Sequence, residues 1–351
     1  MTAREYPVFT VTPKAERSLR AGHPWVYGEE VTAVEGAYQN GDMVDVVSNK
    51  GRYLGTGWVN DHSKIRVRII SRNANDTFDE AFFRRRVCYA LNYRKTVMGP
   101  VDYRCCRLIF GEADQFPGLT VDRFENILVT QVLSLGMERR KDWVYRALVE
   151  LLREDGEQID AIYERNDVTI RTLEGLEQGK GFYQMEGLRT DLSGHVTITE
   201  NGIKYDVDYI EGQKTGFFLD QKYNRQAAAK LARGRRVLDC FTHTGAFALN
   251  AAAAGAEHVT AVDVSAFALE LAAENGKRNG LTNLDYKCAD VFDLLTEMAK
   301  EKKCDYDYII LDPPAFTKSR ATAKNAYHGY KEINRKAMRL LPRGGYLATC
   351  S

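Results

Sequence analysis

The fold of the C-terminal half is decided by residues 236–263, which read RVLDCFTHTGAFALNAAAAGAEHVTAVD. The stretch begins with a short apolar run at 236–240, which is typical of a buried strand. An alanine-rich segment at 245–254 then predicts a helix, and a second apolar run follows at 259–264. A strand, a helix and a strand in this order predict a βαβ unit with two parallel strands.

The same alternation continues toward the end of the sequence. Further strands are expected at 284–288, 308–311 and 346–350, and further helices at 266–279, 291–300 and 325–341. This pattern predicts an α/β fold in which helices cover both faces of a parallel sheet. Such sheets bind their ligands at the carboxyl ends of the strands, near the point where the strand order reverses.

Four acidic residues lie at or just after the ends of successive predicted strands: Asp239, Asp263, Asp290 and Asp312. A carboxylate there costs stability unless it meets a ligand or a hydrogen-bond donor. Asp263 lies 24 positions after Asp239, close to the spacing of the ribose-binding carboxylate in dinucleotide-binding folds. The first turn has a single glycine among threonines and lacks G-x-G-x-x-G, which disfavours a pyrophosphate-binding loop and an NAD-dependent dehydrogenase. A nucleoside without phosphates fits this turn better.

Bulk composition sets broad limits. The sequence has 351 residues, of which 44% are hydrophobic and 28% charged, and its formal net charge is +1. Its length favours two or three domains, and any nucleic-acid signal must be local because no global basic field exists. We find no secretory signal, no apolar stretch near the ~18 residues that span a bilayer, and no metal-like spacing of cysteines and histidines. The scattered cysteines are typical of reduced thiols, which favours the cytosol.

Residues 1–73 are predicted to form short strands between turns. At 64–69 basic and apolar residues alternate, so Lys64, Arg66 and Arg68 share one face of a strand. Taken alone, this pattern is best explained by a half-buried edge strand with solvated charges. The alternative is a small β-barrel whose basic outer face binds phosphates.

The segment that follows mixes helices and strands. Helices are expected at 79–98 and 138–153, and strands at 119–122, 127–133 and 161–165. Between 82 and 107 there are seven Lys or Arg and one acidic residue. A charge run on a helix is usually a solvated face, so this cluster by itself does not indicate a nucleic-acid site.

The strand-end motifs resemble those of class I S-adenosylmethionine-dependent methyltransferases, across 237–249, Asp263, Asp290 and 310–316. More narrowly, the sequence resembles bacterial 23S ribosomal RNA methyltransferases that join a PUA domain, a central linking domain and a catalytic domain. The other motifs that carry this resemblance are His23-Pro-Trp-Val-Tyr27, Gly111-Glu-Ala-Asp114, Pro117-Gly-Leu-Thr-Val-Asp-Arg123, and Lys214-Thr-Gly-Phe-Phe-Leu-Asp-Gln221 with Arg225.

The resemblance implies three domains and a cofactor. A PUA-like RNA-binding β-barrel is expected at 1–73, an α+β linking domain at 74–195 and a Rossmann-like methyltransferase domain at 196–351. The cofactor would be S-adenosyl-L-methionine. Its expected contacts are Phe217, Asp220, Gln221, Arg225, Asp239, Phe241, Thr244, Gly245, Asp263, Val264, Asp290, Val291 and Asp312.

The resemblance also assigns roles to these residues. Asp239 and Gly245 would bracket the loop beside the methionine moiety, although Asp239 could equally cap the following turn. Asp263 would accept hydrogen bonds from both ribose hydroxyls. Asp290 would accept a hydrogen bond from the adenine amino group, and Val291 would lie against the adenine ring.

The expected catalytic residues are Asp312, Pro313, Pro314 and Phe316. The first three would form a rigid shelf where the target base meets the methyl group. Phe316 would stack on that base, with plain core packing as an equal alternative. Downstream, 313–343 hold eight Lys or Arg against one Glu, which suits an RNA substrate better than a small molecule. The expected RNA contacts are Lys64, Arg66, Arg68, Lys318 and Lys331.

The target atom is left open between two choices. In the cytosine-5 relatives a cysteine at the end of the fifth strand attacks C6 of the base, within Thr-x-Ser-Cys-Ser. Here Thr349-Cys350-Ser351 ends the sequence, so the nucleophile would be the next residue, and we expect a piece of a longer protein. Cytosine C5 of 23S rRNA is the first expectation and guanine N7 the second.

Other classes of function and other partners are also weighed. A small-molecule or protein methyltransferase, and an RNA-binding module with a vestigial cofactor fold, remain as alternatives. The expected partner is 23S rRNA. We expect no membrane association, and a homodimer is compatible with the sequence.

Overall fold

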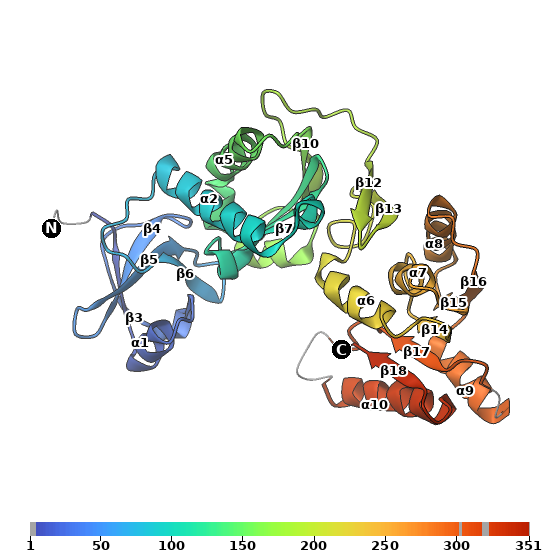
Figure 1. Cartoon of the computed structure of the whole chain (residues 1–351). Coiled ribbons are helices and arrows are strands. Elements are labelled where there is room, and N and C mark those ends of the chain that lie inside the picture. Colours follow the sequence, from blue (N-terminus) through green and yellow to red (C-terminus); the bar gives the residue numbers. More distant parts are fainter. Residues whose placement is uncertain (1–4, 302–303, 318–322, 351) are drawn as a thin grey trace. The chain divides into compact units, whose positions relative to one another are not determined.

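A computed structural model describes residues 5–301, 304–317 and 323–350, and its elements are labelled in Figure 1. The chain divides into two compact units. Residues 1–196 with 207–217 form the N-terminal unit, and 197–206 with 218–351 form the C-terminal unit. Each unit is described by itself.

The N-terminal unit begins with a six-stranded sheet in the order β2-β6-β5-β4-β1-β3. The strands are β1 (Val8–Val11), β2 (Trp25–Tyr27), β3 (Val31–Glu35), β4 (Met43–Ser48), β5 (Tyr53–Val59) and β6 (Ile65–Ser71), with helix α1 (Pro13–Arg20) after β1. Phe9, Val44 and Val67 are fully buried in one apolar cluster beneath this sheet. The alternation predicted at 64–69 is confirmed, because Val67 and Ile69 are buried while Arg66 and Arg68 are half-buried.

A second sheet in the same unit has five strands in the order β11-β10-β9-β8-β7. Its strands are β7 (Cys105–Phe110), β8 (Leu119–Phe124), β9 (Ile127–Val132), β10 (Ala161–Asn166) and β11 (Gly179–Phe182), and helices α2 (Glu80–Val97) and α5 (Lys141–Glu154) accompany it. One apolar cluster includes Trp58 of β5 together with Phe82 of α2 and Met137. The two sheets therefore share one apolar core. The expected domain boundary at residue 73 lies between them in the sequence and remains a prediction.

Strands β12 (His195–Glu200) and β13 (Ile203–Asp208) form a hairpin, of which Thr197–Asp206 belong to the C-terminal unit and the two ends to the N-terminal unit. Its two turn residues, Asn201 and Gly202, both have positive φ, of 54° and 79°. A two-residue loop with positive φ at both positions matches the right-handed twist of a hairpin.

The C-terminal unit contains a parallel sheet in the order β16-β15-β14-β17-β18. Its strands are β14 (Arg236–Cys240), β15 (His258–Asp263), β16 (Leu284–Cys288), β17 (Tyr308–Leu311) and β18 (Tyr346–Thr349). All five lie within one residue of the expected bounds. The order runs outward from β14 to β16 and then resumes on the other side of β14 at β17. The topological switch point therefore lies between β14 and β17.

Helices cover both faces of this sheet, as the sequence predicts. They are α6 (Lys222–Ala229), α7 (Ala246–Ala253), α8 (Ala266–Arg278), α9 (Val291–Glu301) and α10 (Ala323–Leu340). Phe247 and Ala251 of α7 pack in one apolar cluster with Val237 of β14. On the other face, Leu295 of α9 and Ile333 of α10 cluster with Leu238. Residues 237 and 238 alternate between the faces, as a strand requires.

Candidate active site

The loop that leaves β14 bends sharply at the switch point. Phe241, His243 and Gly245 have φ values of 64°, 50° and 84°, so two residues with side chains adopt a backbone conformation that favours glycine. A Cβ on Gly245 would also lie 2.9 Å from the Cβ of Ala272. Such local strain persists where the surroundings impose it, typically at ligand sites. Phe241 packs partly into the α9 side of the core, and Thr244 is half-buried.

Asp239 ends β14 beneath this loop and is 0% exposed. Its Oδ2 accepts hydrogen bonds from Thr242 Oγ1 at 2.5 Å and from the Ala248 N–H at 2.9 Å. Its Oδ1 is buried and accepts no hydrogen bond from the described residues. Burial, with a further contribution from Asp312, raises the pKa of Asp239 to about 7. Asp239 thus caps the turn with one oxygen and leaves the other for a donor that a ligand would supply.

Asp263 ends β15 and holds the same loop from the other side. Its Oδ2 accepts the N–H of His243 and its Oδ1 accepts the N–H of Ser265, each at 2.9 Å. Each carboxylate oxygen can accept a second bond, so two ribose hydroxyls remain compatible with this arrangement. Asp263 therefore also stabilises the loop, a structural role that the sequence does not reveal.

The next strand end supplies Asp290, which caps α9. Its Oδ1 accepts the N–H groups of Phe292 at 2.8 Å and Asp293 at 3.1 Å. The expected contact of Val291 with an adenine ring is not supported, because this side chain is 2% exposed and packs in the core. Val264 is instead the exposed apolar side chain after β15, with 73% of its surface open.

Asp312 follows β17 on the other side of the switch point. Its N–H donates to the Cys240 carbonyl at 3.3 Å, and its Oδ1 accepts from Gln221 Nε2 at 3.2 Å. Gln221 is itself held by Asn224, whose Nδ2 donates to Gln221 Oε1 at 2.6 Å. The strand-end carboxylate is thus oriented by a side chain from the segment before α6.

Pro313, Pro314 and Phe316 continue from Asp312. Pro314 is exposed, and Pro313 is half-buried. The Phe316 ring lies 4.4 Å from the ring of Tyr330 and 5.8 Å from that of Phe292, measured between centroids. The packing interpretation of Phe316 is the one that this geometry favours, because its ring already stacks on the protein.

Arg225, which is expected to contact the cofactor, forms hydrogen bonds within the protein in this structure. Its Nε and one terminal nitrogen donate to the two carboxylate oxygens of Glu200 at 2.7 and 2.9 Å, and it also donates to the Phe218 carbonyl at 2.8 Å. Both side chains are almost completely buried. Arg225 therefore positions the segment that carries Gln221. Asp220 is exposed next to Gln221, whereas Phe217 is buried in the N-terminal unit.

Similarity to known proteins shows which family the chain belongs to. Residues 9–72 match the model of a PUA-like domain, and 183–351 match that of an S-adenosylmethionine-dependent methyltransferase. A Photobacterium profundum protein named Ribosomal RNA large subunit methyltransferase I is 42% identical over 96% of this chain and 83% of its own length. One of the same name from Shewanella denitrificans is 43% identical over 97% and 84%. The chain belongs to the ribosomal RNA large subunit methyltransferase I family.

Solved structures agree on the fold. A candidate S-adenosylmethionine-dependent methyltransferase from Streptococcus mutans has a TM-score of 0.76 at 23% identity, covering 95% of this chain and 83% of its own. A candidate methyltransferase crystallised with S-adenosylhomocysteine has a TM-score of 0.79, also at 23% identity, over 98% and 86%. The expected family, fold class and cofactor are thereby confirmed, and the chain is an S-adenosylmethionine-dependent methyltransferase.

The residues of this methyltransferase fit the cofactor. The buried Oδ1 of Asp239 accepts no hydrogen bond from the described residues and could accept one from a cofactor. Gly245 contributes by allowing the turn at a φ of 84° in close contact with Ala272. Within the described ranges no group of three or more His, Cys, Asp or Glu is suited to a metal ion. No helix in the described part of the chain is long and apolar enough to cross a membrane.

Two further residues at this edge, His243 and Cys350, are not among the site residues expected from the sequence. His243 donates its N–H to Asp263, its ring meets Phe218 edge-on at 5.4 Å, and burial lowers its pKa. Cys350 follows β18, and its N–H donates to the Leu311 carbonyl at 2.8 Å. Burial, and then the neighbouring Asp312, raise the pKa of Cys350 to about 11. The only available signal was that both residues lie within or beside strand ends.

The basic residues expected to bind RNA differ in their surroundings. Arg66 Nε lies 2.9 Å from Asp61, and Arg68 pairs with Glu174 at 2.8 Å and Glu112 at 3.4 Å. Lys64 and Lys331 are exposed, and Lys318 lies outside the described residues.

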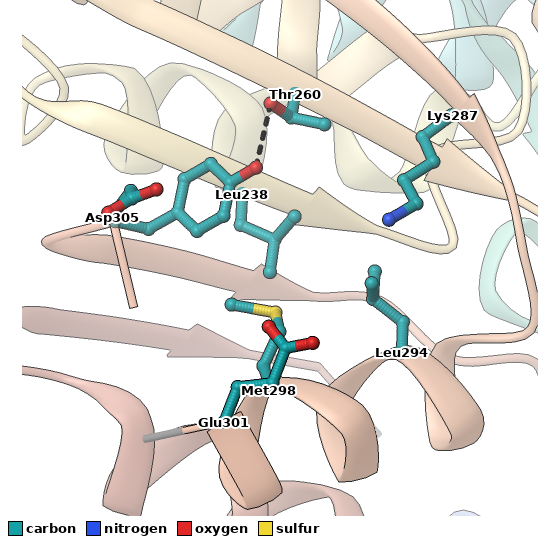
Figure 2. Close-up of a pocket in the computed structure, with 8 residues that line it drawn as sticks. Leu238, Thr260, Lys287, Leu294, Met298, Glu301 and Asp305 are labelled. Carbon is teal, nitrogen blue, oxygen red and sulfur yellow. Dashed lines mark hydrogen bonds between the residues drawn. The ribbon is translucent and has the colours of Figure 1, made fainter. Parts of the chain in front are cut away.

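A hollow of about 180 Å³ lies on the α9 face of the sheet, away from the strand ends. Figure 2 shows side chains that line it, among them Leu238, Lys287 and Met298. Tyr306 closes one side by donating a hydrogen bond to Thr260 at 3.0 Å. It contains none of the four strand-end carboxylates, so the strand ends remain the better candidate site.

Proposed function

We propose that this chain transfers a methyl group from S-adenosylmethionine to a base of large-subunit ribosomal RNA, with cytosine C5 as the target atom. The observation that carries the proposal is the likeness to proteins named Ribosomal RNA large subunit methyltransferase I along nearly all of the chain. A PUA-like domain at 9–72 also suits an RNA substrate. Action on ribosomal RNA would take place in the cytoplasm.

In this proposal the strand-end carboxylates bind and orient the cofactor. The free oxygen of Asp239 would accept from the ammonium group of the methionine moiety. Asp263 would accept from the ribose, with Val264 as the exposed apolar surface beside the adenine. When bound, S-adenosylmethionine supplies an electrophilic methyl group. Preorganised acceptors need no rearrangement on binding, which favours a single orientation of that group.

The shelf at 312–314 would hold the target base. Two consecutive prolines fix φ and remove two backbone donors, so this segment is stiff and leaves its carbonyl groups to the base. The side-chain amide of Gln221 donates a hydrogen bond to the Asp312 carboxylate at 3.2 Å, and the N–H of Asp312 donates to the carbonyl of Cys240. A stiff shelf with an oriented carboxylate can accept from an exocyclic amino group, which cytosine and guanine both carry.

Cytosine C5 chemistry requires a thiolate that attacks C6. Cys350 does not suit this role, because a thiol with a pKa of about 11 is protonated at neutral pH.

Nucleoside analysis of ribosomal RNA tests the proposal. We expect 23S rRNA from a strain that lacks the gene to lose one 5-methylcytidine, and the purified full-length protein to restore it. Loss of 7-methylguanosine instead would assign the guanine N7 alternative. An unchanged methylation profile, together with no transfer to rRNA in vitro, would refute both and favour a small-molecule or protein substrate.

A further inference from the structure

Helix α10 presents a row of basic side chains on one face. Lys324, Lys331, Arg335 and Arg339 are separated by seven, four and four positions, which places them on one side of an α-helix. All four are exposed, and none forms an ion pair with another described residue. Tyr327, 64% exposed, lies near the first of them. We call these five residues the α10 basic face.

The other side of α10 is fixed to the catalytic sheet. Ala326, Ile333 and Ala337 are buried, and Gly329 lies so close to Phe316 that a Cβ there would be 3.1 Å from the ring. Lys336, which points away from the basic face, pairs with Glu332 at 2.6 Å and donates to Thr296 at 2.7 Å. Figure 1 shows α10, in red, beside β18. The basic face therefore has a fixed position relative to the shelf that begins at Asp312.

Most members of the other basic clusters of the sequence form ion pairs with carboxylates of the protein. On α2, Arg84 pairs with Glu150 at 2.7 Å and with Glu154 at 2.8 Å, and Lys95 pairs with Asp155 at 2.7 Å. The remaining pairs in these clusters are Arg85 with Asp76, Arg94 with Asp114, Arg66 with Asp61, and Arg68 with Glu112 and Glu174. A phosphate would have to displace a carboxylate at each of these positions. On α10 it would displace only water and counterions, whose release drives binding.

We propose that the α10 basic face binds the phosphate backbone of a single-stranded rRNA segment next to the target base. This inference rests on the proposed function and adds the surface that holds the substrate. The row from Lys324 to Arg339 spans about 22 Å at 1.5 Å per residue. That length allows the row to contact several consecutive phosphates of one strand. Tyr327 offers a flat ring on which one base of the segment stacks.

The salt dependence of RNA binding tests this surface. The probe is a single-stranded fragment of 23S rRNA, and its affinity for the full-length protein is measured between about 50 and 300 mM salt. In the double variant Lys331→Ala/Arg335→Ala, the slope of log affinity against log salt becomes shallower by about 1.4, at roughly 0.7 per lost contact. The matched control is Arg84→Ala/Lys95→Ala, which removes the same charge from the paired cluster and leaves the slope unchanged.

Two further measurements separate the possible failures. We expect the α10 variant to bind S-adenosylhomocysteine with unchanged affinity, which would show that its cofactor site is intact. In the same variant, KM for rRNA should rise and kcat should stay unchanged. If the unsubstituted protein methylates rRNA and the α10 variant keeps the full salt slope, or the control loses as much, this inference is wrong and the proposed function stands. If the unsubstituted protein neither binds nor methylates rRNA, both are wrong.

Discussion

Asp263 has a structural role besides the ligand role that we propose for it. Besides any ribose hydroxyls, its two carboxylate oxygens accept the N–H groups of His243 and Ser265. Asp263→Ala should weaken S-adenosylhomocysteine binding at least ~10-fold, since loss of one charge-assisted hydrogen bond costs about 1.5–3 kcal/mol. The sequence alone suggests little effect on folding, but the structure predicts a loss of about 1 kcal/mol, as for other lost caps.

Calorimetry and urea unfolding on the same samples separate these two effects. Asp263→Asn keeps one acceptor oxygen and should recover part of the stability while binding remains weak. Unchanged affinity in Asp263→Ala would refute the assignment of the ribose site to the end of β15.

If Asp239 contacts the cofactor as proposed, its raised pKa predicts that cofactor binding depends on pH. Its folded pKa of about 7 lies above the ordinary value of 3.8, so the ligand-free protein holds an extra proton between these values. The stability that this group contributes is fully present below about pH 4 and is lost as the pH rises through 7. A bound ammonium group favours the ionised carboxylate. Affinity for S-adenosylhomocysteine should therefore rise between pH 6 and pH 8.

The matched variant is Asp239→Asn, which cannot ionise. It should bind more weakly at pH 8 and show a flatter pH dependence between pH 6 and pH 8 by calorimetry. Burial lowers the pKa of His243, so it loses its proton at a lower pH than a free histidine. An equally steep rise in Asp239→Asn would show that another group is responsible.

At the scale of elements, the buried pair of Arg225 and Glu200 joins α6 to the β12–β13 hairpin. Arg225→Ala would leave Glu200 charged, buried and unpaired, which should destabilise the C-terminal unit by about 3–5 kcal/mol. Urea unfolding of Arg225→Ala, Glu200→Gln and the double variant measures this. The double variant should lose less than the sum of the singles. Full stability of Arg225→Ala, with weakened cofactor binding, would restore its original assignment as a direct ligand.

The sequence predicted elements where the signal is local. The apolar runs that became β14 and β17 match the structure to the residue, because a strand buried on both faces is a continuous apolar run. The hairpin at 195–208 and α6 were not predicted, since their stability depends on the distant pairing of Glu200 with Arg225. For the same reason the burial of Val291 and the stacking of Phe316 on Tyr330 could not be inferred from spacing.

At the scale of the whole molecule, the two sheets of the N-terminal unit share an apolar core that contains one especially close contact. Gly136, in α4 (Leu135–Glu138), faces the buried ring of Trp58 on β5, and a Cβ there would lie 1.9 Å from the indole. Neither the backbone of α4 nor a fully buried indole can move away without a loss of stability. Gly136→Ala should therefore destabilise this unit by about 3 kcal/mol, the upper end of the usual cost of overpacking. The control Gly181→Ala, on β11 with no atom within 4 Å of the added Cβ, should lose no stability. Calorimetric unfolding measures both. Affinity for S-adenosylhomocysteine should be normal in each, because the four strand-end carboxylates proposed to bind the cofactor all belong to the C-terminal unit. Equal stability of the two variants would mean that the shared core around Trp58 is looser than described.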